Sequence, residues 1–213
     1  MVIVFDYDGT LHNTTRLYGN AFRRAYADLV KDGYAPEHYY SDSDMAQYLG
    51  LAPPVMWHTF MPELPDAVWK KASLKVREGM ISGIENGKAI LYDGVTEMLD
   101  ELKKRGYTLV ILSNCYHAYL AAHRNYFGLD KWFSGYYCSE DWNFVPKEEI
   151  MKGIMQDHPG EEFIVIGDRD SDFIAGIANN IPVIGCAYGF GTEEELKMCN
   201  AIVNEPKTIL EIV

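Results

Sequence analysis

Cysteine is scarce in this sequence, and its few cysteines are not arranged in pairs. The chain has four of them in 213 residues, with no C-x-x-C spacing: Cys115, Cys138, Cys186 and Cys199. A chain of this length does not need disulfide bonds to hold a core together. We therefore expect free, buried thiols in a reducing compartment. The six histidines also lack the H-x-x-x-H spacing that is typical of zinc sites.

Positive charge is also in short supply. Lysine and arginine number 19 against 31 aspartates and glutamates, and the formal net charge is -12. Such a surface repels both the phosphate backbone of nucleic acids and anionic membranes. No apolar run approaches the roughly 20 residues that cross a bilayer, and the sequence opens without the basic leader of a signal peptide. We expect a cytoplasmic protein that binds neither nucleic acid nor membrane.

What the sequence does contain is a series of short hydrophobic runs of strand length. With 48% hydrophobic residues, the chain can bury a sizeable core. Helical stripes, such as the one from Val95 to Leu102, separate the runs. This alternation predicts an α/β fold with a parallel sheet. The expected strands are 2–5, 108–112, 163–166 and 182–186, with shorter ones at 201–203 and 135–138.

One long segment, from about Thr14 to Lys88, breaks this alternation. It holds two helical stripes, from Leu17 to Leu29 and from Trp69 to Met80, and no strand-like run lies between them. The simplest interpretation is a helical insert between the first two strands. We therefore expect residues 14–88 to form a domain of their own, while residues 1–13 and 89–213 form the core.

Polar side chains follow three of the expected strands. They are Asp6 and Asp8 after the first strand, Ser113 and Asn114 after 108–112, and Asp168 with Asp172 after 163–166. Ligands of an open parallel sheet bind outside the carboxyl ends of its strands. Several carboxylates at that edge would repel one another unless a cation lay between them. Because only oxygen ligands are close in sequence, Mg²⁺ is favoured over zinc.

Asp6 and Asp8 together suit a two-step phosphoryl transfer. A carboxylate can attack phosphorus and form an aspartyl-phosphate. A second carboxyl can protonate the leaving oxygen and later activate water. Gly9 lets the chain turn directly after the pair and approach a ligand closely. Taken alone, the pair could equally be two loop carboxylates, and it is the other strand ends that favour the catalytic interpretation.

Other candidates have an ordinary structural interpretation beside the functional one. Ser113 and Asn114 stand where a strand meets a helix, so they could bind an anion or simply cap that helix. Lys147 could be a surface lysine, or it could balance the carboxylates and keep Asp6 ionised. The acidic run from Gly167 to Asp172 could serve a metal, or it could merely complement a helix dipole.

Taken in order along the chain, the candidate residues named above resemble the four motifs of the haloacid dehalogenase-like superfamily. The first motif, Asp-x-Asp-Gly-Thr after an apolar strand, corresponds to residues 6–10, the second to Ser113 and the third to Lys147. The fourth, Gly-Asp with a further Asp, corresponds to Asp168 and Asp172. The resemblance spans nearly the whole chain and extends to the branch of phosphoglycolate phosphatase and β-phosphoglucomutase. It implies a Rossmann-like three-layer α/β/α core with a small helical cap.

The resemblance also implies roles for the motif residues. The catalytic group comprises Asp6 as nucleophile, Asp8 as general acid and base, Ser113 as a hydrogen-bond donor to the phosphate, and Lys147 as the cation that balances the carboxylates. The metal group comprises Asp6, Asp8 through its backbone carbonyl, Asp168, and Asp172 acting through water or Lys147. Substrate contacts are expected from Gly9, Thr10, Asn114, Arg16 and Gly50.

Two of the substrate contacts lie in the expected cap. Arg16 is the cap cation closest in sequence to the first motif, and Gly50 lies in a Leu-Gly-Leu segment that resembles the cap loop of relatives. His12 could touch substrate as well, or it could be an ordinary loop residue.

Together these features predict a Mg²⁺-dependent phosphatase acting on a small phosphorylated metabolite, such as phosphoglycolate or a sugar phosphate, through an aspartyl-phosphate. Relatives that cleave carbon–halogen or phosphonate bonds lack an acidic residue at the position of Asp8. A sugar phosphomutase and an inorganic pyrophosphatase on the same core stay open as alternatives, as does a non-catalytic binding protein. The leaving group and the oligomeric state do not follow from these residues.

Overall fold

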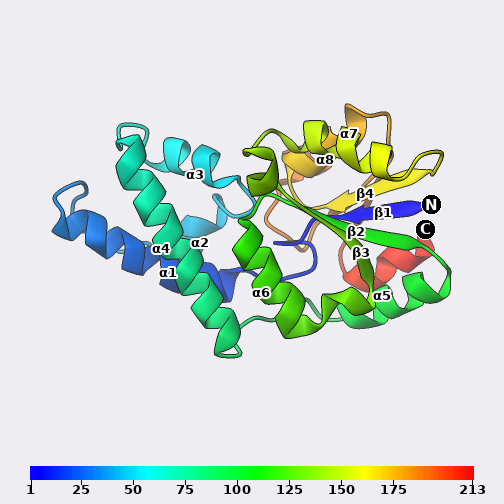
Figure 1. Cartoon of the computed structure of the whole chain (residues 1–213), viewed down its shortest axis with the longest axis horizontal. Helices are drawn as coiled ribbons and strands as arrows, with labels where there is room; N and C mark the ends of the chain where they lie inside the picture. The colour runs from blue at the N-terminus through cyan, green and yellow to red at the C-terminus, as the bar shows by residue number, and fades with distance from the viewer.

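Six parallel strands form one sheet in the computed structural model of the chain, which describes residues 1–213. Their order across the sheet is β3-β2-β1-β4-β5-β6, and Figure 1 labels the first four of these strands. The hydrophobic runs of the sequence predict every one of these strands to within two residues at each end. The strands are β1 (Val2–Phe5), β2 (Thr108–Ser113), β3 (Phe133–Cys138), β4 (Phe163–Gly167), β5 (Val183–Cys186) and β6 (Ala201–Val203).

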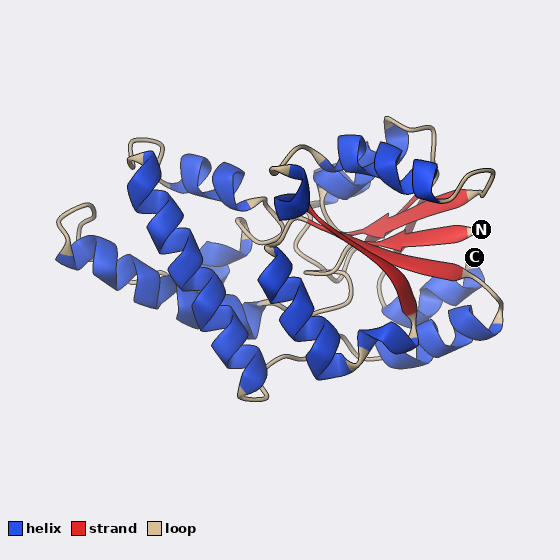
Figure 2. Cartoon of the chain, viewed as in Figure 1, coloured by secondary structure: helices blue, strands red, loops and turns tan.

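Helices cover both faces of the sheet (Figure 2). On one face lie α7 (Lys147–Asp157) and α8 (Asp170–Ile177), and on the other α5 (Val95–Lys104), α6 (His117–Phe127) and the 3-10 helix η3 (Pro206–Glu211). Successive side chains of a strand point to opposite faces. Accordingly, Val2 and Val4 pack with α7 and α8, whereas Ile3 and Phe5 pack with α5 and α6. The predicted Rossmann-like three-layer α/β/α core is confirmed.

The chain between β1 and β2 forms no strand. It folds into four helices, which we call the helical insert: α1 (Thr15–Lys31), α2 (Asp42–Ala46), α3 (Pro53–Phe60) and α4 (Asp66–Glu85). The long helices α1 and α4 pack side by side, away from both termini (Figure 1). They approach closely, since a β-carbon at Gly83 would lie 2.6 Å from Leu17 Cδ2. All four helices fall within residues 14–88, and the status of this segment as a separate domain stays a prediction.

The remaining elements are short. They are the 3-10 helices η1 (Leu129–Lys131) and η2 (Ser139–Trp142), and α9 (Glu193–Leu196). A capping box opens α9, because the Glu195 N–H donates to Thr192 Oγ1 at 3.2 Å and the Thr192 N–H donates to Glu195 Oε2 at 2.6 Å. None of the helices combines the length and the apolar character that crossing a membrane requires. The four cysteines are free thiols, and three of them are buried.

Candidate active site

The polar residues at the carboxyl ends of β1, β2 and β4 gather at one end of the sheet, which we call the acidic edge or, in relation to the insert, the core edge. β1 pairs with β2 on one side and with β4 on the other, so the strand order reverses there, and ligands bind at such switch points. The backbone N–H of Asp6 donates to the Ile166 carbonyl at 2.8 Å, which carries the pairing with β4 into the loop. Asp6 and Ser113 line the same pocket, and Asp168 lies beside Asp6.

Lys147 belongs to this edge and is not a surface lysine. Its Nζ lies 2.6 Å from Asp6 Oδ1 and 2.6 Å from Asp172 Oδ1, and the lysine side chain is only 2% exposed. Burial alone would lower the pKa of Lys147, but the charges of Asp172 and Asp6 raise it well above its usual range. The lysine therefore stays protonated and holds Asp6 by one oxygen.

Negative charge exceeds positive charge around Lys147. Carboxylate oxygens of Asp6, Asp168 and Asp172 all lie within 4.8 Å of one another. Burial raises the pKa of Asp6 to about 7 although Lys147 opposes the change, and burial with the charge of Asp6 also raises the pKa of Asp168. Asp6 Oδ2 is buried and has no hydrogen-bond partner. These residues fit a divalent cation, which would meet the orphaned oxygen and balance the charge.

The two oxygens of Asp172 are already occupied. Oδ1 accepts from Lys147, and Oδ2 accepts from the backbone N–H of Asp168 at 3.1 Å and of Arg169 at 3.0 Å. One oxygen of Asp6, in contrast, has no hydrogen-bond partner in the protein. Asp6 and Asp168 are thus the candidates for direct metal ligands, and Asp172 supports the site through Lys147.

Gly9 and Thr10 hold the first loop against Asp168. Gly9 has a φ of +94°, and a β-carbon there would collide with the Asp168 carboxylate, so only glycine fits. Thr10 is completely buried, and its hydroxyl donates to Asp168 Oδ1 at 3.3 Å. Neither residue lines the pocket. Expected as substrate contacts, both instead shape the loop that carries Asp6 and Asp8.

Asp8 is held through one of its two oxygens. Oδ1 accepts from the Tyr119 hydroxyl at 2.7 Å and the Thr14 hydroxyl at 2.5 Å, and it lies 3.0 Å from His12 Nδ1. Burial would raise the pKa of Asp8, but the hydrogen bond and charge at His12 outweigh burial and lower it. Oδ2 takes part in none of these contacts, so it is the oxygen available to a substrate in the pocket.

His12 contacts Asp8 from inside the core and lies away from the pocket. It is completely buried, its ring lies 4.3 Å from that of His123 between centroids, and it does not line the pocket. Of its two sequence interpretations, substrate contact is therefore excluded. Tyr119 was missed altogether, since it lies 111 residues beyond Asp8 and no local pattern joins the two.

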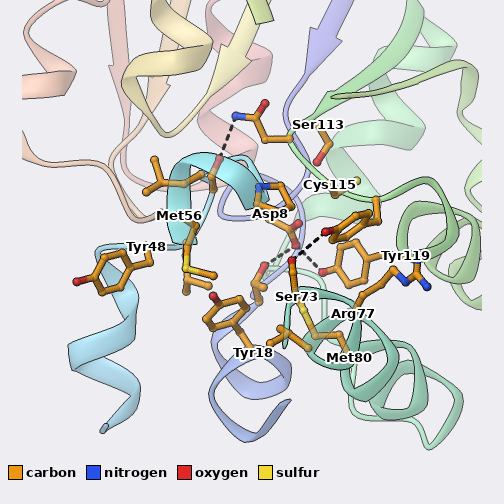
Figure 3. Close-up of a pocket in the computed structure, with 18 of the residues that line it drawn as sticks. Asp8, Tyr18, Tyr48, Met56, Ser73, Arg77, Met80, Ser113, Cys115 and Tyr119 are labelled. Atoms are coloured by element: carbon orange, nitrogen blue, oxygen red, sulfur yellow. Dashed lines mark hydrogen bonds between the residues drawn. The ribbon is translucent and has the colours of Figure 1, made fainter. Parts of the chain in front are cut away.

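A pocket lies between this edge and the helical insert (Figure 3). The core supplies acidic and polar residues to it: Asp6, Asp8, Ser113 and Asn114. The insert supplies mainly apolar and aromatic side chains, among them Tyr18, Tyr48, Met56, Trp57, Val76 and Met80. Arg77 of α4 is the only cation among the residues that line the pocket.

Arg16 does not reach this pocket, contrary to the expectation from the sequence. It is exposed on α1 and lines a separate hollow together with Arg24. Tyr18 of the same helix does line the pocket. Residues two apart on an α-helix lie about 200° around its axis, so Arg16 faces away. Arg77 takes the place that was expected for Arg16.

Gly50 and Asn114 both line the pocket, and they join the insert to the core. Asn114 Nδ2 donates to the Gly50 carbonyl at 3.1 Å. Arg169 Nη1 donates to the Leu49 carbonyl at 2.6 Å, while its Nε pairs with Glu195 Oε1 at 3.0 Å. The loop before α3 is therefore tied to residues that follow β2 and β4. The sequence did not single out Arg169.

The sequence model of a family described as haloacid dehalogenase-like hydrolases matches residues 3–186 of the chain. The match spans every residue of the acidic edge, from Asp6 to Asp172. The chain belongs to this family. The predicted family is thereby confirmed, and with it the expectation that the protein is an enzyme of the hydrolase class.

Relatives of this haloacid dehalogenase-like hydrolase match it along nearly its whole length. It is 26% identical over 201 residues to a 5′-nucleotidase from Pseudomonas aeruginosa, covering 92% of the chain and 86% of the relative. It is 25% identical over 198 residues to a phosphoglycolate phosphatase from Agrobacterium fabrum, covering 88% and 80%. The crystal structure of a predicted phosphatase from Clostridium acetobutylicum matches with a TM-score of 0.83 at 27% identity, covering 99% and 98%. The core and the helical insert both belong to this shared fold.

Proposed function

We propose that this hydrolase is a Mg²⁺-dependent phosphatase that hydrolyses small phosphomonoesters through an aspartyl-phosphate on Asp6. The observation that carries the proposal is the state of Asp6. Its Oδ1 lies against Lys147, and its Oδ2 is buried near Asp168 without a partner. A purely structural carboxylate would have both oxygens satisfied, whereas a nucleophile beside a metal needs one left free. The relatives named as phosphatases support the same reaction.

Asp6, Asp168 and the backbone carbonyl of Asp8 would hold Mg²⁺, with Asp172 in support through Lys147. When bound, Mg²⁺ supplies positive charge that offsets the negative charge of the phosphoryl group. Lys147 favours the ionised form of Asp6 against the effect of burial and fixes its orientation, because its ammonium group lies against Asp6 Oδ1.

The reaction then proceeds in two displacements at phosphorus. Asp6 attacks the phosphorus atom and forms a new P–O bond, while the bond to the leaving alcohol breaks and Asp8 Oδ2 gives that alcohol its proton. The bound phosphate is itself an anion, so it raises the proton affinity of Asp8 before the transfer. Water next attacks the aspartyl-phosphate and gives its proton to Asp8, which releases phosphate and regenerates Asp6. The Ser113 hydroxyl and the backbone N–H of Asn114 donate to the non-bridging oxygens, since the Asn114 side chain is engaged with Gly50.

We assign to the helical insert, within residues 14–88, the role of a cap domain over a core of residues 1–13 and 89–213. The contacts from Asn114 to Gly50 and from Arg169 to Leu49 hold its loop against the site. A closed cap excludes bulk water from the reacting groups. The free thiols support a cytoplasmic location and hence a metabolite substrate.

Hydrolysis of a monoester is favoured over the two alternative reactions on a similar core. A sugar phosphomutase would hold a second phosphate against the cap, and a pyrophosphatase would expel a phosphate toward it. Either reaction places additional negative charge beside the insert, where Arg77 is the only cation lining the pocket. A monoester with an uncharged leaving group meets no such mismatch.

Asp6→Asn tests the proposal. Phosphate release from p-nitrophenyl phosphate in the presence of Mg²⁺ should fall on the order of 10⁴-fold, because an amide does not attack phosphorus. EDTA should abolish the wild-type activity. Asp170→Asn, in the first turn of α8 next to the site, is the matched control and should keep its activity. Wild-type turnover by Asp6→Asn would overturn the proposal, and an isomeric sugar phosphate in place of free phosphate would indicate a mutase.

A further inference from the structure

A second cluster of metal-ligating side chains lies outside the pocket. His117 Nδ1, Cys138 Sγ and a carboxylate oxygen of Asp141 all lie within 4.8 Å of one another. Apart from the acidic edge, no other three histidine, cysteine, aspartate or glutamate side chains of the chain come together in this way. None of the three residues lines the pocket, and the proposed reaction uses none of them.

The backbone around η2 brings the sulfur and the carboxylate of this cluster together. Cys138 ends β3 and is the N-cap residue of η2, and Asp141 is the third residue of that 3-10 helix. An N-cap side chain and the third helical residue lie on the same side of the chain, as the partners of a capping box do. Cys138 Sγ and Asp141 Oδ2 are accordingly 3.0 Å apart. The Cys-x-x-Asp spacing therefore directs a sulfur and an oxygen to one point.

The third group comes from the start of α6. The ring Nδ1 of His117 lies 3.0 Å from Asp141 Oδ2, and the backbone N–H of His117 donates to Glu140 Oε2 at 2.8 Å. The strands that precede these two elements pair in register, with Ser113 of β2 opposite Cys138 of β3. Groups on elements that are fixed in this way are held close to their positions before a ligand binds. The cluster is thus preorganised by the sheet.

The distances within the cluster are close to those that a bound zinc ion requires. With Zn–N and Zn–O bonds of roughly 2.1 Å and a Zn–S bond of roughly 2.3 Å, tetrahedral ligand atoms lie about 3.4–3.6 Å apart. The two contacts of Asp141 Oδ2 are each 3.0 Å long, so each would lengthen by only about half an ångström. The side chains of His117 and Asp141 are 67% and 47% exposed, whereas Cys138 is buried. An ion therefore reaches the sulfur from the solvent side, past two side chains that can adjust.

The charge around the cluster favours a divalent cation. Glu140 and Asp141 are adjacent, and the only ion-pair partner of either side chain is the His117 ring. When a metal binds, the Cys138 thiol loses its proton to solvent and its sulfur forms the new bond to the ion. The ligands are then a thiolate, a neutral imidazole and a carboxylate. This set suits Zn²⁺ and not Mg²⁺, which takes oxygen ligands.

We propose that His117, Cys138 and Asp141 form a second metal site, which binds Zn²⁺. It shares no residue with the acidic edge, so the proposal stands independently of the proposed function. Three protein ligands leave the fourth tetrahedral position to water. The ion joins η2 to the first residue of α6. Because Tyr116, the residue before that one, lines the pocket, the ion fixes the segment between β2 and α6.

Absorption spectroscopy with Co²⁺ in place of Zn²⁺ tests the proposal. Co²⁺ accepts the same ligands, and a thiolate bound to it gives a charge-transfer band in the near ultraviolet, which oxygen ligands do not give. Metal-free, reduced full-length protein is titrated with Co²⁺ in the presence of excess Mg²⁺. We expect the band to saturate at one Co²⁺ per chain, to persist when more Mg²⁺ is added and to disappear when Zn²⁺ is added. Absence of the band, or its removal by Mg²⁺, overturns the proposal.

Variants of the ligands and of matched positions assign the band. Cys138→Ser should abolish it, whereas Cys199→Ser should keep it, since Cys199 is more exposed than Cys138 but belongs to no such cluster. Asp141→Asn and His117→Asn change exposed side chains and should weaken Co²⁺ binding about tenfold or more, because loss of an outer partner alone costs that much. His38→Asn, also exposed, should bind Co²⁺ like wild type. A band that survives Cys138→Ser, or unchanged affinity in both Asp141→Asn and His117→Asn, contradicts the proposal.

Discussion

The core edge and the insert wall of the pocket, meaning the insert residues that line it, differ in charge: the edge holds a buried cluster of carboxylates, and the wall has a single charged side chain, Arg77. At the edge, the protein supplies its own counter-charge, since Lys147 contacts both Asp6 and Asp172. Under the proposed function, the difference separates two tasks: the strand ends would carry the chemistry at phosphorus, and the insert would set the preference for a leaving group. One can therefore be altered without the other.

The largest effect is expected when the counter-charge of the edge is removed. Lys147→Met leaves Asp6 and Asp172 buried without a cation, so the free energy of unfolding of the metal-free protein should fall by about 3–5 kcal/mol. Denaturation in urea measures this loss. Lys152→Met, at an exposed position of the same helix, should change stability by less than about 0.5 kcal/mol. Equal stability of Lys147→Met and wild type would show that the edge does not depend on this lysine.

A pH dependence should distinguish the edge from the wall in the metal-free protein. Folding raises the pKa of Asp6 from 3.8 to about 7, so the folded protein binds this proton more tightly than the unfolded chain. The contribution to stability is full below about pH 4 and is lost as pH rises toward 7. Urea unfolding of wild type and Asp6→Asn across this range isolates the effect. A difference between them that does not vary with pH would contradict the assignment.

Mg²⁺ should stabilise the edge and leave the wall unaffected. At a concentration one hundred times its Kd, a ligand that binds only the folded state adds about 2.7 kcal/mol to stability. Thermal unfolding at pH 7 with and without Mg²⁺ measures this gain. Asp168→Asn should lose most of it, and Trp57→Phe should keep it. A full gain in Asp168→Asn would exclude Asp168 as a ligand.

A smaller effect on the rate is expected from Tyr119, which contacts Asp8 but belongs to none of the four motifs. Tyr119→Phe removes one donor to Asp8 Oδ1, so kcat should fall about tenfold while KM changes by less than twofold. Initial rates over a range of substrate concentrations separate the two constants. Tyr126→Phe, an exposed position of α6, is the control. A rise in KM with kcat unchanged would mean that Tyr119 binds substrate and does not position Asp8.

The smallest effect concerns the contact that joins the two regions. Arg169→Leu removes the donor to the Leu49 carbonyl, and KM should rise about threefold to fivefold because the loop is held less firmly. Arg24→Leu, exposed on the far side of α1, should leave KM unchanged. If both variants behave like wild type, the contact of Arg169 with the insert does not contribute to substrate binding.

The sequence predicts the edge well because strands have a direction. An apolar run that ends in polar residues fixes which side chains stand at the carboxyl end of the sheet, and parallel pairing then brings the ends together. This logic places Asp6, Ser113 and Asp168 correctly. It also explains Lys147, because a buried lysine is expected at this place only once the carboxylates whose charge it balances are known.

The wall could not be predicted in the same way. The side of a helix that faces a pocket depends on tertiary packing, and proximity in sequence to the first motif misled the choice of Arg16. The buried stripe of α1, which contains Leu17, Ala21 and Phe22, offered a signal against it, since Arg16 lies outside that stripe. The contact of Tyr119 with Asp8 joins distant segments and leaves no periodic trace.

The most direct measurement of the central claim is to map the phosphorylated intermediate. Wild-type protein turning over p-nitrophenyl phosphate with Mg²⁺ is treated with sodium borohydride, which reduces an acyl phosphate to an alcohol, and its peptides are analysed by mass spectrometry. We predict reduction at Asp6 alone, and none when substrate is omitted. Reduction at Asp8 or Asp168, or sustained turnover with no reduced aspartate, would contradict the account.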